Sequence, residues 1–267
     1  MSRPDIAIVL VAIAALFSWY AVAHDLRIGR LIGGRWNRLY PYANAYVRAS
    51  PATFLYAAII AFTTWVLAGS SGRLSNALLR TQSTNISNLR HHAVDVLLRS
   101  AFWSGYPYVL PIIAALAAVL APAEFWLGTK RAILVFAIGH VGATLLTAAG
   151  ISLALRLALA PRGVEHSIDV GVSYGTLCIA GVLTYRIPRP WRYVWILGML
   201  TVLGLIAVVD ASFSDYGHLV AVALGLCCYP MTRTPRALER SRVPLFRPWL
   251  MGAPPQFPAS PMPQPSP

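Results

Sequence analysis

Two side chains that could act together as a nucleophile and a base lie inside apolar stretches of the sequence. Ser173 occurs in an apolar run over residues 168–185, and His218 occurs in another over residues 214–231. A histidine within hydrogen-bond reach of a serine can take up the hydroxyl proton, which activates the serine oxygen as a nucleophile. Because an ionisable side chain inside an apolar segment is energetically costly, such a residue is a candidate for function.

Three further ionisable residues lie in or beside apolar runs, namely His140, Asp169 and Asp215. His140 is interpreted as a hydrogen-bonded packing residue, with an auxiliary catalytic role as the alternative. Asp169 precedes Ser173 by four positions, and Asp215 precedes His218 by three. Carboxylates at the start of a helix interact favourably with its dipole, so this role is the simpler interpretation of both.

The elements that must position these residues are membrane-spanning helices. Of the 267 residues, 57% are hydrophobic and 12% are charged, whereas soluble domains have roughly 45–50% apolar and about 25% charged residues. A helix needs about 20 apolar residues to cross the hydrocarbon core. Seven runs qualify, at residues 5–23, 51–70, 103–121, 132–155, 168–185, 192–209 and 214–231. The sequence therefore predicts an all-α polytopic protein of the cell membrane, in which the first run is a spanning helix and not a signal peptide.

Positive charge gathers in alternate segments between these runs. The net charge is +13, and basic residues follow the first, third, fifth and seventh runs. This distribution is typical of cytoplasmic segments, so we expect the N-terminus outside, the C-terminus in the cytoplasm, the lipid bilayer as a partner, and no nucleic acid. Residues 71–102 fit less well, since they carry four arginines on the outer side. Their interspersed leucines and valines predict short amphipathic helices in the outer interface.

This orientation brings Ser173 and His218 to a common depth. The fifth and seventh runs both begin on the outer side, and the two side chains lie about 6–8 Å below that boundary at 1.5 Å per residue. Gly217, Ala221 and Gly225 form a small-residue repeat beside the histidine. Small residues let membrane helices approach closely, so the two side chains are expected to meet; the alternative is that the small residues mark a packing face alone.

Four segments together carry a resemblance to the rhomboid family. Gly171-Val172-Ser173-Tyr174-Gly175 resembles the GxSG nucleophile motif, and Gly217-His218 through Ala221 and Gly225 resembles the sixth core helix. Residues 97–102 resemble the end of the long first loop. Glu124 to Arg131 resembles the ExxxGxxR turn. The resemblance covers about residues 51–231, in order and in the expected topology.

The resemblance implies a fold and a reaction. It implies a six-helix core with one additional N-terminal transmembrane helix, and a Ser-His dyad without an aspartate. Ser173 would attack the scissile carbonyl, and His218 would take up its proton. Gly171, Tyr174 and Gly175 would support the nucleophile motif and the oxyanion. The expected substrates are single-span membrane proteins, cut near their outer ends, with no cofactor and no metal.

The sequence also departs from the family pattern. Family members place a histidine and an asparagine on the second core helix to stabilise the oxyanion, whereas residues 96–139 contain neither. Tyr174 stands where the family prefers a small residue, and Leu177 stands where an aromatic side chain often contacts the histidine. These departures favour the alternative of a rhomboid-like pseudoprotease that binds transmembrane clients without cutting them.

A redox or metal-binding membrane protein is a further alternative. It would use His140, His166 and His218, but these three histidines are expected at staggered depths. Histidines that hold haem or metal usually lie at matching depth on facing helices. The sequence therefore favours this class of protein less than a protease or a client-binding protein.

Three regions follow from the sequence. Residues 1–50 comprise the first transmembrane helix and a basic cytoplasmic loop, residues 51–231 comprise the rhomboid-like core, and residues 232–267 form a tail rich in proline. Proline lacks a backbone donor and fixes φ. The tail is therefore predicted to be a disordered cytoplasmic extension.

Overall fold

The computed structural model describes residues 42–104, 109–158, 171–209 and 213–242. Within these residues the chain forms helices and turns and contains no strand. The predicted first helix at residues 5–23 and the proline-rich end of the tail lie outside the described residues.

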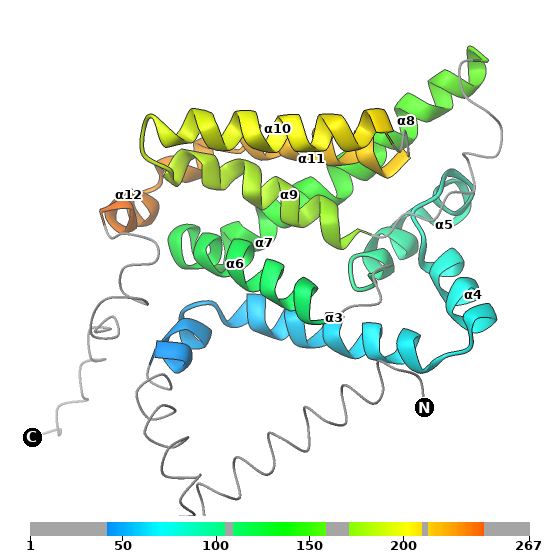
Figure 1. The fold of residues 1–267 in the computed structure, drawn as a ribbon, viewed down its shortest axis with the longest axis horizontal. Coiled ribbons are helices and arrows are strands. Elements are labelled where there is room, and N and C mark those ends of the chain that lie inside the picture. The colour runs from blue at the N-terminus through cyan, green and yellow to red at the C-terminus, as the bar shows by residue number, and fades with distance from the viewer. Residues whose placement is uncertain (1–41, 105–108, 159–170, 210–212, 243–267) are drawn as a thin grey trace, which may run out of the picture. The chain divides into compact units, whose positions relative to one another are not determined.

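The described helices pack together in a bundle (Figure 1). In chain order they are α3 (Pro51–Gly69), α4 (Gly72–Gln82), α5 (Ile86–Ser100), α6 (Val109–Leu127), α7 (Thr129–Ala137), the π-helical turn η1 (Ile138–Gly142), α8 (Ala143–Arg156), α9 (Val172–Leu183), the 3₁₀ turn η3 (Thr184–Arg186), α10 (Trp191–Val209), α11 (Phe213–Cys227), the 3₁₀ turn η4 (Tyr229–Arg233) and α12 (Pro235–Ser241). All of them belong to one compact unit, residues 50–241.

Four stretches of the described chain are long and apolar enough to span a membrane. They are Pro51–Gly69, Leu110–Leu127, Thr129–Arg156 and Trp191–Val209. The prediction of an all-α polytopic membrane protein is therefore confirmed. The second of these helices ends six residues later than the predicted run 103–121, because Pro122 and Glu124 continue the helix instead of ending it.

The helices that carry Ser173 and His218 are shorter than the predicted runs. α9 has 12 residues and α11 has 15, whereas a spanning helix needs about 20. Each continues into a 3₁₀ turn, η3 and η4 respectively. Nine residues of α9 are buried, whereas Ala207 is the one buried residue recorded for α10. α9 therefore lies inside the bundle, and α10 lies at its edge.

The buried carboxylate of Glu124 fixes the start of α3. It accepts hydrogen bonds from the backbone N–H groups of Ala52 and Thr53, at 3.1 and 2.8 Å, and from the Thr53 hydroxyl at 2.8 Å. The Thr129 hydroxyl, beyond the turn between α6 and α7, donates to it at 2.8 Å. Gly128 makes that turn with a φ of +86°, a conformation that favours glycine. These contacts explain why a glutamate and a glycine occur four residues apart in this segment.

Two amphipathic helices, α4 and α5, occupy the segment between the first two spanning helices. The Ser71 side chain caps α4, and the Asn85 side chain caps α5 by accepting the N–H of Asn88 at 2.8 Å. Both caps are residues that favour the start of a helix. The expectation of short helices within residues 71–102 is confirmed.

Candidate functional site

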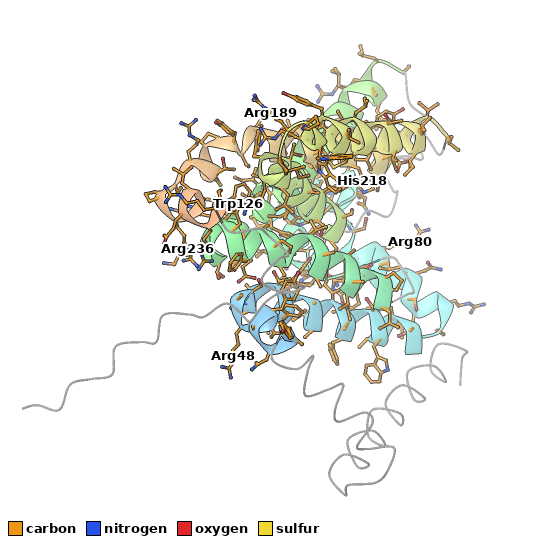
Figure 2. All side chains as sticks on the ribbon, turned by 60° about the vertical axis from the view of Figure 1, so that its left-hand side comes forward. Arg48, Arg80, Trp126, Arg189, His218 and Arg236 are labelled. Atoms are coloured by element: carbon orange, nitrogen blue, oxygen red, sulfur yellow. The ribbon has the colours of Figure 1, made fainter. Side chains whose placement is uncertain are left out.

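The structure brings Ser173 and His218 into hydrogen-bond contact. His218 Nε2 lies 3.0 Å from Ser173 Oγ, although 45 residues separate them along the chain. With the ring proton on Nδ1, Nε2 accepts the hydroxyl hydrogen, which is the arrangement that a general base requires. Figure 2 shows Arg236 of α12 and Arg80 of α4 toward opposite ends of the core, with His218 nearer to the Arg80 end.

Small residues allow α9 and α11 to approach closely enough for this contact. A β-carbon on Gly181 would lie 2.6 Å from the carbonyl oxygen of Val222, and one on Gly225 would overlap the carbonyl oxygen of Cys178. Ala221 is fully buried in the same contact region. The backbones of the two helices therefore touch where the sequence places its small-residue repeat, as membrane helices do at such motifs.

Tyr174 supplies an aromatic contact to the histidine. Its ring is fully buried and meets the His218 ring edge-on, with centroids 5.4 Å apart and planes at 74°. A β-carbon on Gly217 would overlap the Tyr174 ring, so this glycine makes room for it. The aromatic contact expected at Leu177 is made by Tyr174, a role that the sequence did not predict. The sequence feature that could have revealed this contact is Gly217, directly before His218. A glycine there leaves room for the bulky residue that follows Ser173.

Asp215 also faces the histidine ring. Its Oδ1 atom lies 3.8 Å from His218 Nδ1, and both side chains are largely buried. This separation is longer than a hydrogen bond, but it gives a direct charge interaction when the ring is protonated. Asp215 is also in the first turn of α11, so the predicted role at the helix dipole is compatible with its position.

His140 contacts α5 and the residue at the start of α9. Its Nε2 atom lies 2.8 Å from the carbonyl oxygen of Leu97 and 3.3 Å from the Ser100 hydroxyl. A β-carbon on Gly171 would overlap the His140 ring, and the Gly171 N–H donates to the Ser100 carbonyl at 3.0 Å. These contacts agree with the interpretation of His140 as a hydrogen-bonded packing residue. They also place it against the residue at the start of α9, two positions before Ser173.

The remaining motif residue, Gly175, has a steric role. A β-carbon at this position would overlap the ring of Phe136 in α7. Gly171 and Gly175 therefore let the serine helix pack closely against the helix segment formed by α7 and η1. The N-cap of α9 is Gly171, which has no side chain that could occupy the first backbone N–H groups of the helix. Those groups and the positive end of the helix dipole lie beside Ser173.

In the described part of the chain, no three His, Cys, Asp or Glu side chains form a group that could hold a metal ion. Of the residues named as candidates in the sequence analysis, His166 and Asp169 fall within residues 159–170, outside the described residues. Both histidines whose contacts are described above, His140 and His218, interact with a serine hydroxyl.

Comparison with known proteins identifies the family. A family model described as rhomboid-like protein matches residues 45–238. A search of curated proteins and a search of solved structures each found no match. The matched region contains the serine and histidine helices, the Glu124 turn and all four candidate spanning helices. The chain therefore belongs to the rhomboid-like family of membrane proteins.

Proposed function

We propose that this protein is an intramembrane serine endopeptidase that cleaves single-span membrane proteins with a Ser173–His218 dyad. The observation that supports this proposal most strongly is the 3.0 Å contact between the serine hydroxyl and the histidine ring. A nucleophile and a base within hydrogen-bond reach are the minimum that covalent acyl transfer requires.

In the proposed reaction, Ser173 Oγ attacks the scissile carbonyl while His218 Nε2 takes up the hydroxyl proton. The protonated ring then donates this proton to the leaving amine, which gives an acyl-enzyme and a shortened product. Water attacks the acyl-enzyme with His218 again as the base. The Asp215 carboxylate, 3.8 Å from Nδ1, favours the protonated ring that forms in both steps.

The developing oxyanion would be stabilised mainly by the backbone at the start of α9. Its first N–H groups have no partner within the helix, and the helix dipole adds positive potential there. Residues 96–139 supply no histidine or asparagine side chain for this purpose. Loss of one oxyanion donor commonly lowers turnover about 10²–10³-fold, so we expect slow proteolysis.

The substrate proposal follows from the position of the dyad within the bundle. His218 lies toward the end of the core that carries Arg80 (Figure 2), the end that we propose as the outer side because the other basic segments alternate with it along the chain. A transmembrane helix that loses its regular structure near that surface would expose a peptide bond at the depth of Ser173. The N-terminus would then lie outside, and the C-terminus would lie in the cytoplasm.

A client-binding pseudoprotease is the second candidate. The missing side-chain donors on α6 favour it, and the fully buried Tyr174 after the serine fills space that a small residue would leave open. Both candidates require a bundle that recognises transmembrane helices. They differ in whether Ser173 is reactive.

Labelling of the purified protein with a fluorophosphonate probe distinguishes the two. We expect labelling of the wild type and loss of labelling in Ser173→Ala and His218→Ala. Ser152→Ala, which removes another serine from a spanning helix, is the matched control and keeps full labelling. An unlabelled wild type, beside an active rhomboid protease that is labelled under the same conditions, would contradict the protease proposal and favour the client binder.

A further inference from the structure

A second candidate site lies away from the dyad, in a cavity of about 520 Å³ between α3, α5 and the α7–η1 segment. Neither Ser173 nor His218 lines this cavity. Its walls include α3 from Ala52 to Ile59 and the α7–η1 segment from Ala132 to Val141. The cavity therefore follows two helices that are candidate membrane spans.

The cavity follows the helix axes. At 1.5 Å per residue, the lining on the α7–η1 segment extends about 14 Å along the helix axis, and the lining on α3 extends about 10 Å. Tyr56 of α3 and Phe136 of α7 meet edge-on within this lining, with ring centroids 5.2 Å apart. An apolar chain that enters the cavity therefore lies against these two rings.

The lining of the cavity is almost entirely apolar. Most of its side chains are aliphatic or aromatic, including Leu55, Ile59, Leu98, Phe102, Ile133 and Phe136. Its three ionisable side chains already bind within the protein, and one of them, the Tyr56 hydroxyl, donates to the Ala101 carbonyl at 2.5 Å. Glu124 accepts hydrogen bonds from the first turn of α3, and His140 contacts the Leu97 carbonyl and the Ser100 hydroxyl. Water or a polar ligand would therefore find few partners here.

Side chains at the cavity face the surface of the bundle. Leu55 on α3 is 67% exposed, Leu98 on α5 is 65% exposed and Ile133 on α7 is 55% exposed. Because the chain is a polytopic membrane protein, apolar side chains exposed on its spanning helices meet lipid. Because this apolar lining is open to the bilayer, we infer that the cavity binds one acyl chain of a membrane phospholipid, which lies along α3 and α7 against the Tyr56 and Phe136 rings.

His140 connects this lipid site to the serine helix. His140 is among the residues that line the cavity, and its ring also packs against Gly171, the N-cap of α9. An acyl chain in the cavity supports the His140 ring and, through it, the backbone that positions Ser173. Lipid binding itself does not depend on proteolysis; the effect on Ser173 rests on the function proposed above.

Photo-crosslinking in vesicles tests the lipid site without any need for catalysis. Ser173→Ala protein is placed in phosphatidylglycerol and phosphatidylethanolamine vesicles that contain phosphatidylcholine with a diazirine halfway along one acyl chain. Crosslinks are expected at Tyr56 and Phe136, which line the cavity and are half-buried. Ala137→Phe, at the last residue of α7, fills the cavity and should lower these crosslinks at least fivefold. Leu55→Trp, at the mouth of the cavity, should have the same effect.

The controls show whether the loss is local. Ala149→Phe makes the same change at an exposed position of α8 that does not line the cavity, and it should leave the crosslinks at Tyr56 and Phe136 unchanged. Crosslinks at Leu197, exposed on α10, should be equal in all variants. Equal labelling of Tyr56 and Phe136 in the filled and control variants would overturn the proposal. Absence of lipid from both positions in the Ser173→Ala parent would do so as well, because another part of the chain would then cover the cavity.

The link to the serine has a separate readout. Removal of lipid by detergent should slow fluorophosphonate labelling of Ser173 several-fold in the wild type, and added phospholipid should restore it. In Ala137→Phe the labelling rate should not respond to lipid, since a side chain replaces the acyl chain. A response of equal size in Ala137→Phe and Ala149→Phe would contradict the link while leaving the crosslinking result intact.

Discussion

Two helix contacts in this protein are built in opposite ways. Where α9 meets α11, glycines bring the backbones into contact, and a β-carbon on Gly225 or Gly181 would overlap or crowd a carbonyl oxygen of the other helix. Where α3 faces α7, the large rings of Tyr56 and Phe136 meet edge-on, 5.2 Å apart, beside a cavity of about 520 Å³. The first contact fixes two side chains at 3.0 Å. Tight backbone packing therefore occurs where Ser173 and His218 meet, and open packing occurs at the cavity for which we propose a bound acyl chain.

The largest effect is expected from Gly225→Val. Its β-carbon would overlap the Cys178 carbonyl oxygen, which cannot move without displacing α9. Overpacking of a core commonly costs about 1–3 kcal/mol, and a clash with backbone should reach or exceed the upper value. Gly204→Val on α10 is the control, because nothing lies within 4 Å of a β-carbon there. Thermal unfolding in detergent should show a large fall in the midpoint for the first variant and little change for the second; equal falls would contradict the packing difference.

A somewhat smaller effect is expected from Glu124→Gln. Glutamine would turn its N–H₂ group toward the Thr53 N–H or the Thr129 hydroxyl, which both donate to the Glu124 carboxylate in the wild type. Glu124 is 2% exposed, so water cannot replace the lost contact. Leaving a buried donor unsatisfied costs about 1–3 kcal/mol, and the Glu124 variant should lose stability in this range in the same unfolding measurement. Glu239→Gln on α12 is the matched control. A Glu124→Gln protein as stable as the wild type would show that the carboxylate is not needed to hold the start of α3.

Asp215→Asn should change reactivity more than stability. Asn keeps the size of the side chain but removes the charge that lies 3.8 Å from His218 Nδ1. The initial rate of fluorophosphonate labelling should fall about tenfold, equivalent to about 1.4 kcal/mol, with little change in the unfolding midpoint. Asp95→Asn, which removes an exposed carboxylate on α5, should leave the rate unchanged. If Asp215→Asn is labelled at the wild-type rate, Asp215 interacts only with the dipole of α11 and does not assist His218.

The smallest effect is expected from Ala137→Leu, which adds a side chain to the open contact. The added atoms enter existing space beside α3, so stability should change by less than about 0.5 kcal/mol. Ala221→Leu makes the same change in the closed contact, where Ala221 is fully buried, and should destabilise the protein by about 1–3 kcal/mol. Similar losses in the two variants would remove the distinction between the contacts.

Much of the fold could be predicted from the sequence because apolar runs and charged loops follow directly from the cost of placing polar groups in lipid. Four of the predicted runs correspond to candidate spans, and the small residues beside His218 lie at the contact with α9. The expectation that Ser173 and His218 meet rested on the constant rise of a helix per residue, and the two side chains lie 3.0 Å apart. It needed only the position of each residue within its run.

The details of the site depend on contacts between distant parts of the chain. The aromatic contact came from Tyr174, whose ring fits because Gly217 lacks a side chain on the facing helix. Periodicity within one helix cannot reveal such a pairing. α9 begins later than the predicted run 168–185, of which residues 168–170 lie outside the described part of the chain, and nine residues of α9 are buried by neighbouring helices. Local hydrophobicity does not distinguish burial in protein from exposure to lipid.

Proteolysis in vesicles tests the central claim most directly. Purified wild type, Ser173→Ala and His218→Ala are reconstituted with a panel of single-span membrane proteins that contain helix-destabilising residues near their outer ends, and the products are identified by mass spectrometry. The account predicts slow cleavage by the wild type within the outer part of the substrate helix, and no cleavage by either variant. Binding of the same substrates by all three proteins, with no cleavage by the wild type, would contradict the account and identify a client-binding protein.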